Sequence, residues 1–133
     1  MNGINRVLAL VALSLVVASA VLAEESAYDL STPDKAIQSF FAATQTNDLE
    51  SVELMLSPKI KELLQSGKPS LKEYVQAWTH YPIVEVEKAE QFSFKGDPRV
   101  LARAKIVILV EGKKHETRVT VIKIGDQWLW NEK

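Results

Sequence analysis

Apolar side chains recur every three or four positions between residues 32 and 81, the spacing that places them along one face of a helix. The first such segment begins at Thr32-Pro33-Asp34. Threonine can cap free backbone N–H groups, proline suits the first helical position, and aspartate is favoured near the positive end of the helix dipole. We therefore predict a helix from this point, with a buried stripe made of Ile37, Phe40, Phe41 and Thr44.

A second helical segment follows at once. Asn47 tolerates the left-handed backbone that ends a helix, and Asp48 can cap the next one, which is predicted over residues 49–56. Ser57-Pro58 then repeats the pattern of a cap followed by proline, and Gly67 ends the segment. The apolar stripe of the part after the proline is formed by Ile60, Leu63 and Leu64.

A third helix is predicted after a capping box, in which Ser70 and Glu73 satisfy each other's backbone donors. Pro82 closes this helical half of the chain. From residue 83 the apolar residues alternate with polar ones, which is the period of a half-buried strand. The alternation is irregular around residues 88–90, where a bulge is expected.

Three more strands are predicted after the first. Residues 99–110 give the clearest one, because every second residue from Val100 to Val110 is apolar. Residues 115–124 and 127–131 follow, and each is preceded by a turn that contains a glycine. Helices first and an antiparallel four-stranded meander second predict an α+β fold, with the helices gathered on one face of the sheet. Residues 32–133 are predicted to form one domain.

The residues before this domain have the pattern of a secretory signal. One positive charge at Arg6 precedes an apolar run over residues 7–17, and Val21-Leu22-Ala23 is a cleavage site of the small-x-small kind. The run is shorter than the roughly 20 residues that span a bilayer. We predict a cleaved signal over residues 1–23, a flexible lead-in over residues 24–31, and a periplasmic or secreted domain with no stable membrane span. The alternative is an uncleaved membrane anchor.

Charge and cysteine content narrow the possible partners. Without Arg6, 15 lysines and arginines face 17 aspartates and glutamates, a formal net charge of −2. This balance argues against a nucleic-acid binder, which needs a basic surface. The chain has no cysteine, so it has no disulfide, no thiolate ligand and no thiol nucleophile. No metal site or cofactor is predicted.

The segment from Thr32 to Ala43 with Asn47-Asp48-Leu49-Glu50, and the ending from Val119 to Trp130, resemble nuclear transport factor 2-like domains. In that family a helix of the form P-x-x-A-x-x-F-x-x-A precedes a short x-D-L step, and a Gly-acid turn leads into a tryptophan. The chain is most similar to small exported bacterial members, many of them of unknown function or called lumazine-binding-like. The resemblance implies a cone-shaped domain whose curved sheet wraps the helices, with room for a pocket between them. It does not imply an activity.

One group of side chains is a candidate ligand site. Aromatic rings at helical spacing and two tryptophans on one side of the last strand could line the mouth of a pocket, with an arginine to anchor an anion. The alternative is that the rings fill the core. The candidate residues are Tyr74, Trp78, Tyr81, Arg103, Trp128 and Trp130.

Catalytic residues are not predicted. Enzymes that this family includes use an aspartate or histidine in the pocket, but the inward positions of the strand over residues 99–110 are all apolar. His80 is expected at a helix end and His115 at the start of a strand, and both are expected to face solvent. With no cysteine and no pair of histidines at i, i+4, the sequence lacks the ligand spacing of a metal site.

The strands also carry apolar residues on the face of the sheet that is expected to be exposed to solvent. The segment from Ile106 to Val110 is apolar on both faces, and the next strand shows the same feature at Val119, Val121, Ile122 and Ile124. This pattern indicates either a homodimer through the sheet face, or local cover by residues 24–31 or by curvature of the sheet.

Three functions compete on these grounds. We favour an exported, non-catalytic domain of the bacterial envelope that binds a small ligand or a protein. The alternative is a structural or assembly protein that uses an exposed sheet face, and a small-molecule isomerase or lyase is favoured less. An empty pocket above about 300 Å³ would support ligand binding, whereas a filled interior would support assembly.

Overall fold

The computed structural model describes residues 28–132. Its helices are α2 (Pro33–Gln45), α3 (Leu49–Met55), α4 (Pro58–Gln65) and α5 (Leu71–Thr79). Its strands are β1 (Ile83–Val86), β2 (Glu90–Phe92), β3 (Leu101–Val110), β4 (Lys113–Ile124) and β5 (Gln127–Glu132). The predicted signal and residues 24–27 of the predicted lead-in lie outside the described residues.

The helices begin where the sequence predicts. Thr32 Oγ1 accepts the backbone N–H of Lys35 at 3.3 Å, and Pro33 occupies the first turn of α2. Asn47 lies between α2 and α3 with φ 56°, the left-handed conformation expected of it. The predicted capping box is also confirmed, since the Ser70 hydroxyl and the Glu73 carboxylate each accept the other residue's backbone N–H.

The second predicted segment is divided into two helices, α3 and α4. Leu56 adopts an extended conformation between them and forms a parallel bridge with Trp130. The N–H of Ser57 then donates to the carbonyl of Trp130 at 2.9 Å, and its hydroxyl caps α4. The break therefore lets residues 56–57 cover the free edge of β5. Leu63, which was expected in the buried stripe, is 54% exposed, so α4 packs mainly through Ile60.

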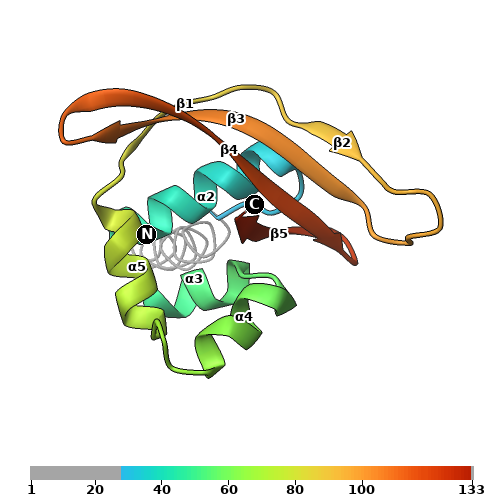
Figure 1. Cartoon of the computed structure of the whole chain (residues 1–133), viewed down its shortest axis with the longest axis horizontal. Coiled ribbons are helices and arrows are strands. Elements are labelled where there is room, and N and C mark those ends of the chain that lie inside the picture. The colour runs from blue at the N-terminus through green and yellow to red at the C-terminus, as the bar shows by residue number, and fades with distance from the viewer. Residues whose placement is uncertain (1–27, 133) are drawn as a thin grey trace, which may run out of the picture.

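The sheet is antiparallel, with strand order β1-β3-β4-β5 and with β2 paired to β3 as well. The first predicted strand is thus two short strands on the same edge of β3. The stretch between them, residues 87–89, overlaps the position where a bulge was expected, whereas the register shift lies earlier, between Ile83 and Glu85. Figure 1 shows β3 and β4 as a long bent ribbon that arches over α2.

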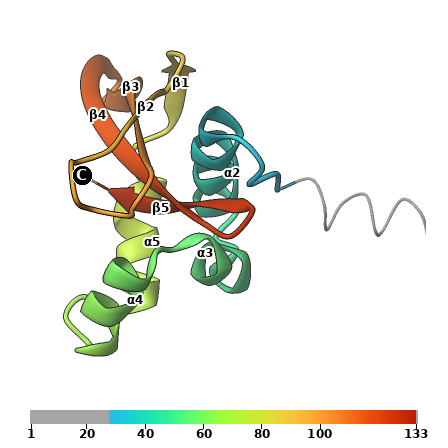
Figure 2. The same ribbon diagram turned by 90° about the vertical axis from the view of Figure 1, so that its right-hand side faces the viewer.

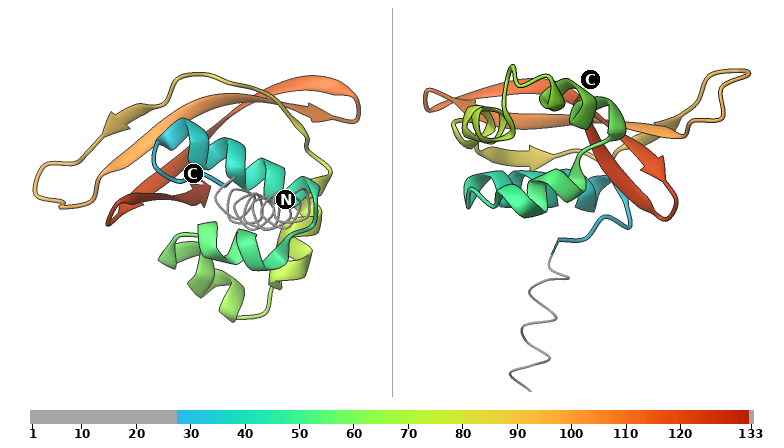
Figure 3. Two further views of the ribbon diagram at one scale, coloured as in Figure 1. Left: turned by 180° about the vertical axis from the view of Figure 1, so that it is seen from behind. Right: turned by 90° about the horizontal axis from the view of Figure 1, so that it is seen from below.

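The described helices all lie on one side of the β3–β4 ribbon, so the fold is α+β (Figures 1 and 2). The core lies between the two layers, and its sheet side is made of the inward residues of β3, β4 and β5. The two ends of the ribbon project beyond the helices (Figure 3). The fully buried side chains on the helical side include Ile37, Phe40, Phe41, Val52, Ile60 and Val75.

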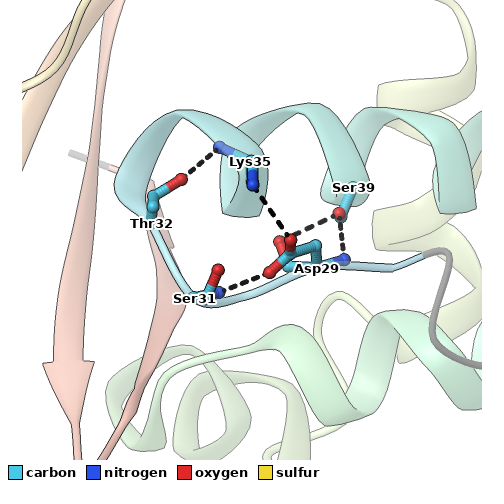
Figure 4. A network of polar contacts seen from close by, with 5 residues as sticks. All are labelled: Asp29, Ser31, Thr32, Lys35 and Ser39. Carbon is cyan, nitrogen blue, oxygen red and sulfur yellow. Dashed lines mark hydrogen bonds and ion pairs between the residues drawn. The ribbon is translucent and has the colours of Figure 1, made fainter.

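Residues 28–31 are the described part of the predicted lead-in. They are held by hydrogen bonds and an ion pair to α2 and β5. Asp29 exchanges two hydrogen bonds with the Ser39 hydroxyl, at 2.9 and 3.2 Å, and its carboxylate forms an ion pair with Lys35 at 3.4 Å (Figure 4). The carbonyl of Leu30 accepts the N–H of Trp128 at 2.8 Å. Leu30 and residues 56–57 thus both bond to the outer edge of β5.

No helix within residues 28–132 combines the length and the apolar character that a bilayer span requires.

Candidate functional site

Four of the predicted site residues meet on the helical side of the sheet. Trp130 donates its indole N–H to the Tyr74 hydroxyl at 2.8 Å. The ring of Trp78 lies edge-on to Trp130, with 5.2 Å between centroids, and to Tyr81, with 6.1 Å between centroids. Helix α5 and strand β5 therefore bring these rings together as the sequence spacing predicted.

The rings form part of a filled core. Trp130 is 1% exposed and stacks on Phe40 with 3.9 Å between centroids and 5° between planes. Phe41 closes the other side edge-on, at 5.7 Å from Trp130. Burial raises the pKa of the Tyr74 hydroxyl. Trp128 is 3% exposed and belongs to the same core. Of the two interpretations of the aromatic residues, core packing is the one that these contacts support.

Arg103 is not part of this group. Its neighbours Ala102 and Ala104 are buried in the core, so the alternation along β3 directs Arg103 to the face that points away from the helices. There its guanidinium lies 4.9 Å from the centroid of the Phe92 ring. The predicted anion anchor and the predicted aromatic group are thus on opposite faces of the sheet.

A hollow of about 460 Å³ lies on that opposite face, and we call it the outer-face hollow. Its floor is formed by β3 and β4, and its rim by β2 and the connection between β1 and β2. Its volume falls within the range of small-molecule sites, roughly 300–1,000 Å³. It is lined by Glu87, Lys88, Glu90, Gln91, Phe92, Arg103, Lys105 and Arg118.

Two cations face each other across this floor. Lys105 and Arg118 are partners in the β3–β4 register, so their side chains project from the same face. Lys105 Nζ forms ion pairs with Glu116 at 3.3 Å and with Glu87 at 3.7 Å. The hydrogen bond to Glu116, helped by the charge of Glu87, raises the pKa of Lys105. Lys105 therefore stays a cation at any physiological pH.

The two arginines of the hollow have no carboxylate partner among residues 28–132. Arg118 makes no hydrogen bond, ion pair or ring contact there. Arg103 lies opposite Glu90 in the β2–β3 register, yet its guanidinium contacts the Phe92 ring and forms no ion pair. By contrast, Arg99 is held by Asp97 at 2.7 Å. The hollow therefore presents two guanidinium groups whose hydrogen-bond donors are available.

The apolar residues of the outer face are largely covered. Leu101, Ile122 and Leu129 form a small second cluster, each less than 10% exposed, and Leu30 and Phe92 pack against it. These apolar residues of the outer face are therefore covered locally, in part by Leu30 of the predicted lead-in. Val107 and Leu109 are half-buried farther along β3. Ile124 and Phe94 remain open, at 46% and 57% exposure.

Neither histidine lines the hollow. His80 caps the end of α5, His115 lies on β4, and both are exposed. Within residues 28–132, no three histidine or acidic side chains converge as metal ligands would. The inward side chains of β3 from Ala102 to Ile108 are aliphatic and buried.

Arg103 was predicted as a site residue, but Arg118 and Lys105 were not. In the sequence, both strands show polar residues that alternate with core residues, and these polar residues were candidates for a site. The sequence does not tell which of them are neighbours, because that depends on the β3–β4 register.

Comparison of the chain with family models, with curated proteins and with solved structures finds no match.

Proposed function

We propose that this chain is an exported, non-catalytic domain of the nuclear transport factor 2-like kind that binds a small molecule in the outer-face hollow. The observation that carries the proposal is the contrast between the two faces of the sheet. The helical side is packed with stacked rings, whereas the opposite side has a hollow of about 460 Å³ with unpaired guanidinium groups. The outer-face hollow therefore offers a ligand both space and available hydrogen-bond donors.

Several features support the other parts of this proposal. The order of elements, with helices before an antiparallel meander, agrees with what the resemblance implies. Export is supported by the charge, apolar and small-residue zones of residues 1–23. A non-catalytic role is supported by the aliphatic inward face of β3 and by the exposed positions of both histidines.

The test is native mass spectrometry of the protein purified from its own cell envelope, under conditions that retain bound small molecules. We expect a mass above that of the chain from residue 24 to 133, and release of one small molecule on activation. Arg118→Gln is expected to lose the added mass. Lys59→Gln removes one exposed cation from α4, across the molecule from the hollow, and is expected to keep it.

Assembly through the outer face is the second candidate, and the exposure of Phe94 and Ile124 at one end of that face favours it. The same spectrum separates the two functions. A monomer with an added small mass supports ligand binding. A dimer without one supports assembly and contradicts the ligand proposal, and a bare monomer contradicts both.

A further inference from the structure

The floor of the outer-face hollow departs from what stability alone favours. Lys105 and Arg118 are direct cross-strand neighbours on one face, and like charges at such positions destabilise a sheet. An acid at either position would give an attractive pair instead. A local conflict of this kind is expected where a residue serves a function rather than the fold.

The acids of the floor pair with Lys105 and not with Arg118. Glu116 and Glu87 both bind Lys105 and offset its charge. Arg118 forms no ion pair among residues 28–132. Its N–H donors are therefore available, at the side of the hollow formed by β4.

Arg103 provides a second guanidinium on the same floor. It is opposite Thr120, two residues from Arg118 along β4, which makes the two arginines diagonal neighbours on one face. Such neighbours are roughly 7–8 Å apart, a distance that two long side chains can close around one small group. Arg103 lies over the Phe92 ring and forms no ion pair among residues 28–132, so its N–H donors stay available for a ligand.

We infer that the ligand of the outer-face hollow carries a carboxylate, which is held between the guanidinium groups of Arg103 and Arg118. This inference rests on the proposed function. A carboxylate offers two acceptor oxygens in one plane, which match the fork of N–H donors on a guanidinium. One carboxylate can accept hydrogen bonds from both guanidinium groups, because each of its oxygens accepts more than one.

The net charge of the hollow matches a carboxylate better than a phosphate. Four cations line it, whereas Glu87 and Glu90 line it and Glu116 pairs with Lys105, so four positive charges less three negative ones leave a formal charge of about +1, which one monoanion neutralises. The same two acids can accept hydrogen bonds from hydroxyl or ammonium groups elsewhere on the ligand. The hollow therefore fits a small carboxylic acid with polar donors beyond the carboxylate.

The chain offers an internal control for a direct test. The arginines after residue 23 are Arg99, Arg103 and Arg118, and Arg99 is already bound by Asp97. The protein, purified after expression of the full chain and labelled with ¹⁵N, is titrated with sodium benzoate while sodium chloride keeps the ionic strength constant. The arginine Nε–H resonances are followed by NMR, and a second titration uses inorganic phosphate.

We expect benzoate to shift the Arg103 and Arg118 resonances along one saturable curve in the millimolar range, with Arg99 unmoved. Arg118→Gln is expected to weaken binding about tenfold, the effect of one charge-assisted hydrogen-bonded pair, and Arg118→Lys by less. Lys59→Gln should leave the curve unchanged. Equal shifts at Arg99, shifts that do not saturate, or tighter binding of phosphate than of benzoate would each overturn the carboxylate assignment.

Failure of this inference is distinguishable from failure of the proposed function. A molecule retained in the native spectrum and lost in Arg118→Gln, with no response to benzoate, leaves the binding domain in place and removes the carboxylate. Absence of a retained molecule together with no response to benzoate removes both.

Discussion

The indole N–H of Trp130 donates to the hydroxyl of Tyr74 at 2.8 Å, although 56 residues separate them in the chain. This bond joins α5 to β5 inside the aromatic core, and both side chains are buried. A buried donor that loses its acceptor costs more than the bond itself contributes, because the donor has been removed from water. The pair therefore connects the helical layer to the last strand.

Tyr74→Phe is expected to lower the free energy of unfolding by about 1–3 kcal/mol, since it leaves the Trp130 N–H buried without a partner. Urea unfolding followed by tryptophan fluorescence measures the change. Tyr81→Phe is the matched control, because Tyr81 is 36% exposed and its hydroxyl makes no hydrogen bond among residues 28–132. Its effect is expected within about 0.5 kcal/mol. Equal losses in the two variants would contradict the role of the hydrogen bond.

A second long-range hydrogen bond joins α2 to the rim of the hollow. Asp34 Oδ1 accepts the backbone N–H of Ala89 at 2.8 Å, and Ala89 lies between two rim residues, Lys88 and Glu90. Asp34→Ala is expected to speed amide hydrogen exchange at Ala89 and to destabilise the fold by about 0.5–2 kcal/mol, because the variant also loses a favourable charge in the first turn of a helix. Exchange measured by NMR reports the local effect.

Asp34→Asn is the control for this hydrogen bond. It keeps an acceptor oxygen at the same place, so Ala89 is expected to remain protected even though the charge is gone. An Ala89 amide that exchanges at the same rate in the wild type and in Asp34→Ala would show that the carboxylate does not hold the rim.

The local rules of helix and turn formation account for what the sequence predicted well. Thr32, Asp48 and Ser70 cap helices through contacts within three residues, so their roles can be inferred from the neighbouring residues alone. The end of the second helix at residue 56 and the new start at Ser57-Pro58 were predicted in the same way, but the bridge from Leu56 to Trp130, 74 residues later, was not. The outer-face hollow depends in the same way on strand register, which no local pattern determines.

Acid is expected to weaken the cap of α3. Asp48 accepts the Ser51 hydroxyl at 2.7 Å and the Ser51 backbone N–H at 3.2 Å, and these bonds, the hydroxyl first, hold its pKa below the ordinary value. A carboxylate whose pKa is lowered by folding stabilises the fold fully above its unfolded pKa, about 3.9, and this contribution is lost as the pH falls through the folded value.

Asp48→Asn tests this dependence, because asparagine also caps helices but does not titrate. The melting temperature of the wild type is expected to fall more steeply between pH 4 and pH 2 than that of Asp48→Asn, and the difference between the two proteins should be constant above about pH 5. Parallel curves over the whole range would show that the Asp48 carboxylate is not linked to folding.

Arg118→Gln is expected to weaken ligand binding without destabilising the domain. Removal of one of two like charges that face each other across β3 and β4 relieves a repulsion of at most about 0.2–1 kcal/mol, since Glu87 and Glu116 already offset the charge of Lys105. The gain should shrink as salt is added, because the charges are exposed enough to be screened. Lys59→Gln, which removes an exposed cation from α4, is expected to change the free energy of unfolding by less than about 0.5 kcal/mol at any salt concentration. Urea unfolding at low and high ionic strength measures both variants. A loss of stability in Arg118→Gln would mean that this arginine serves the fold and is not kept for an anion.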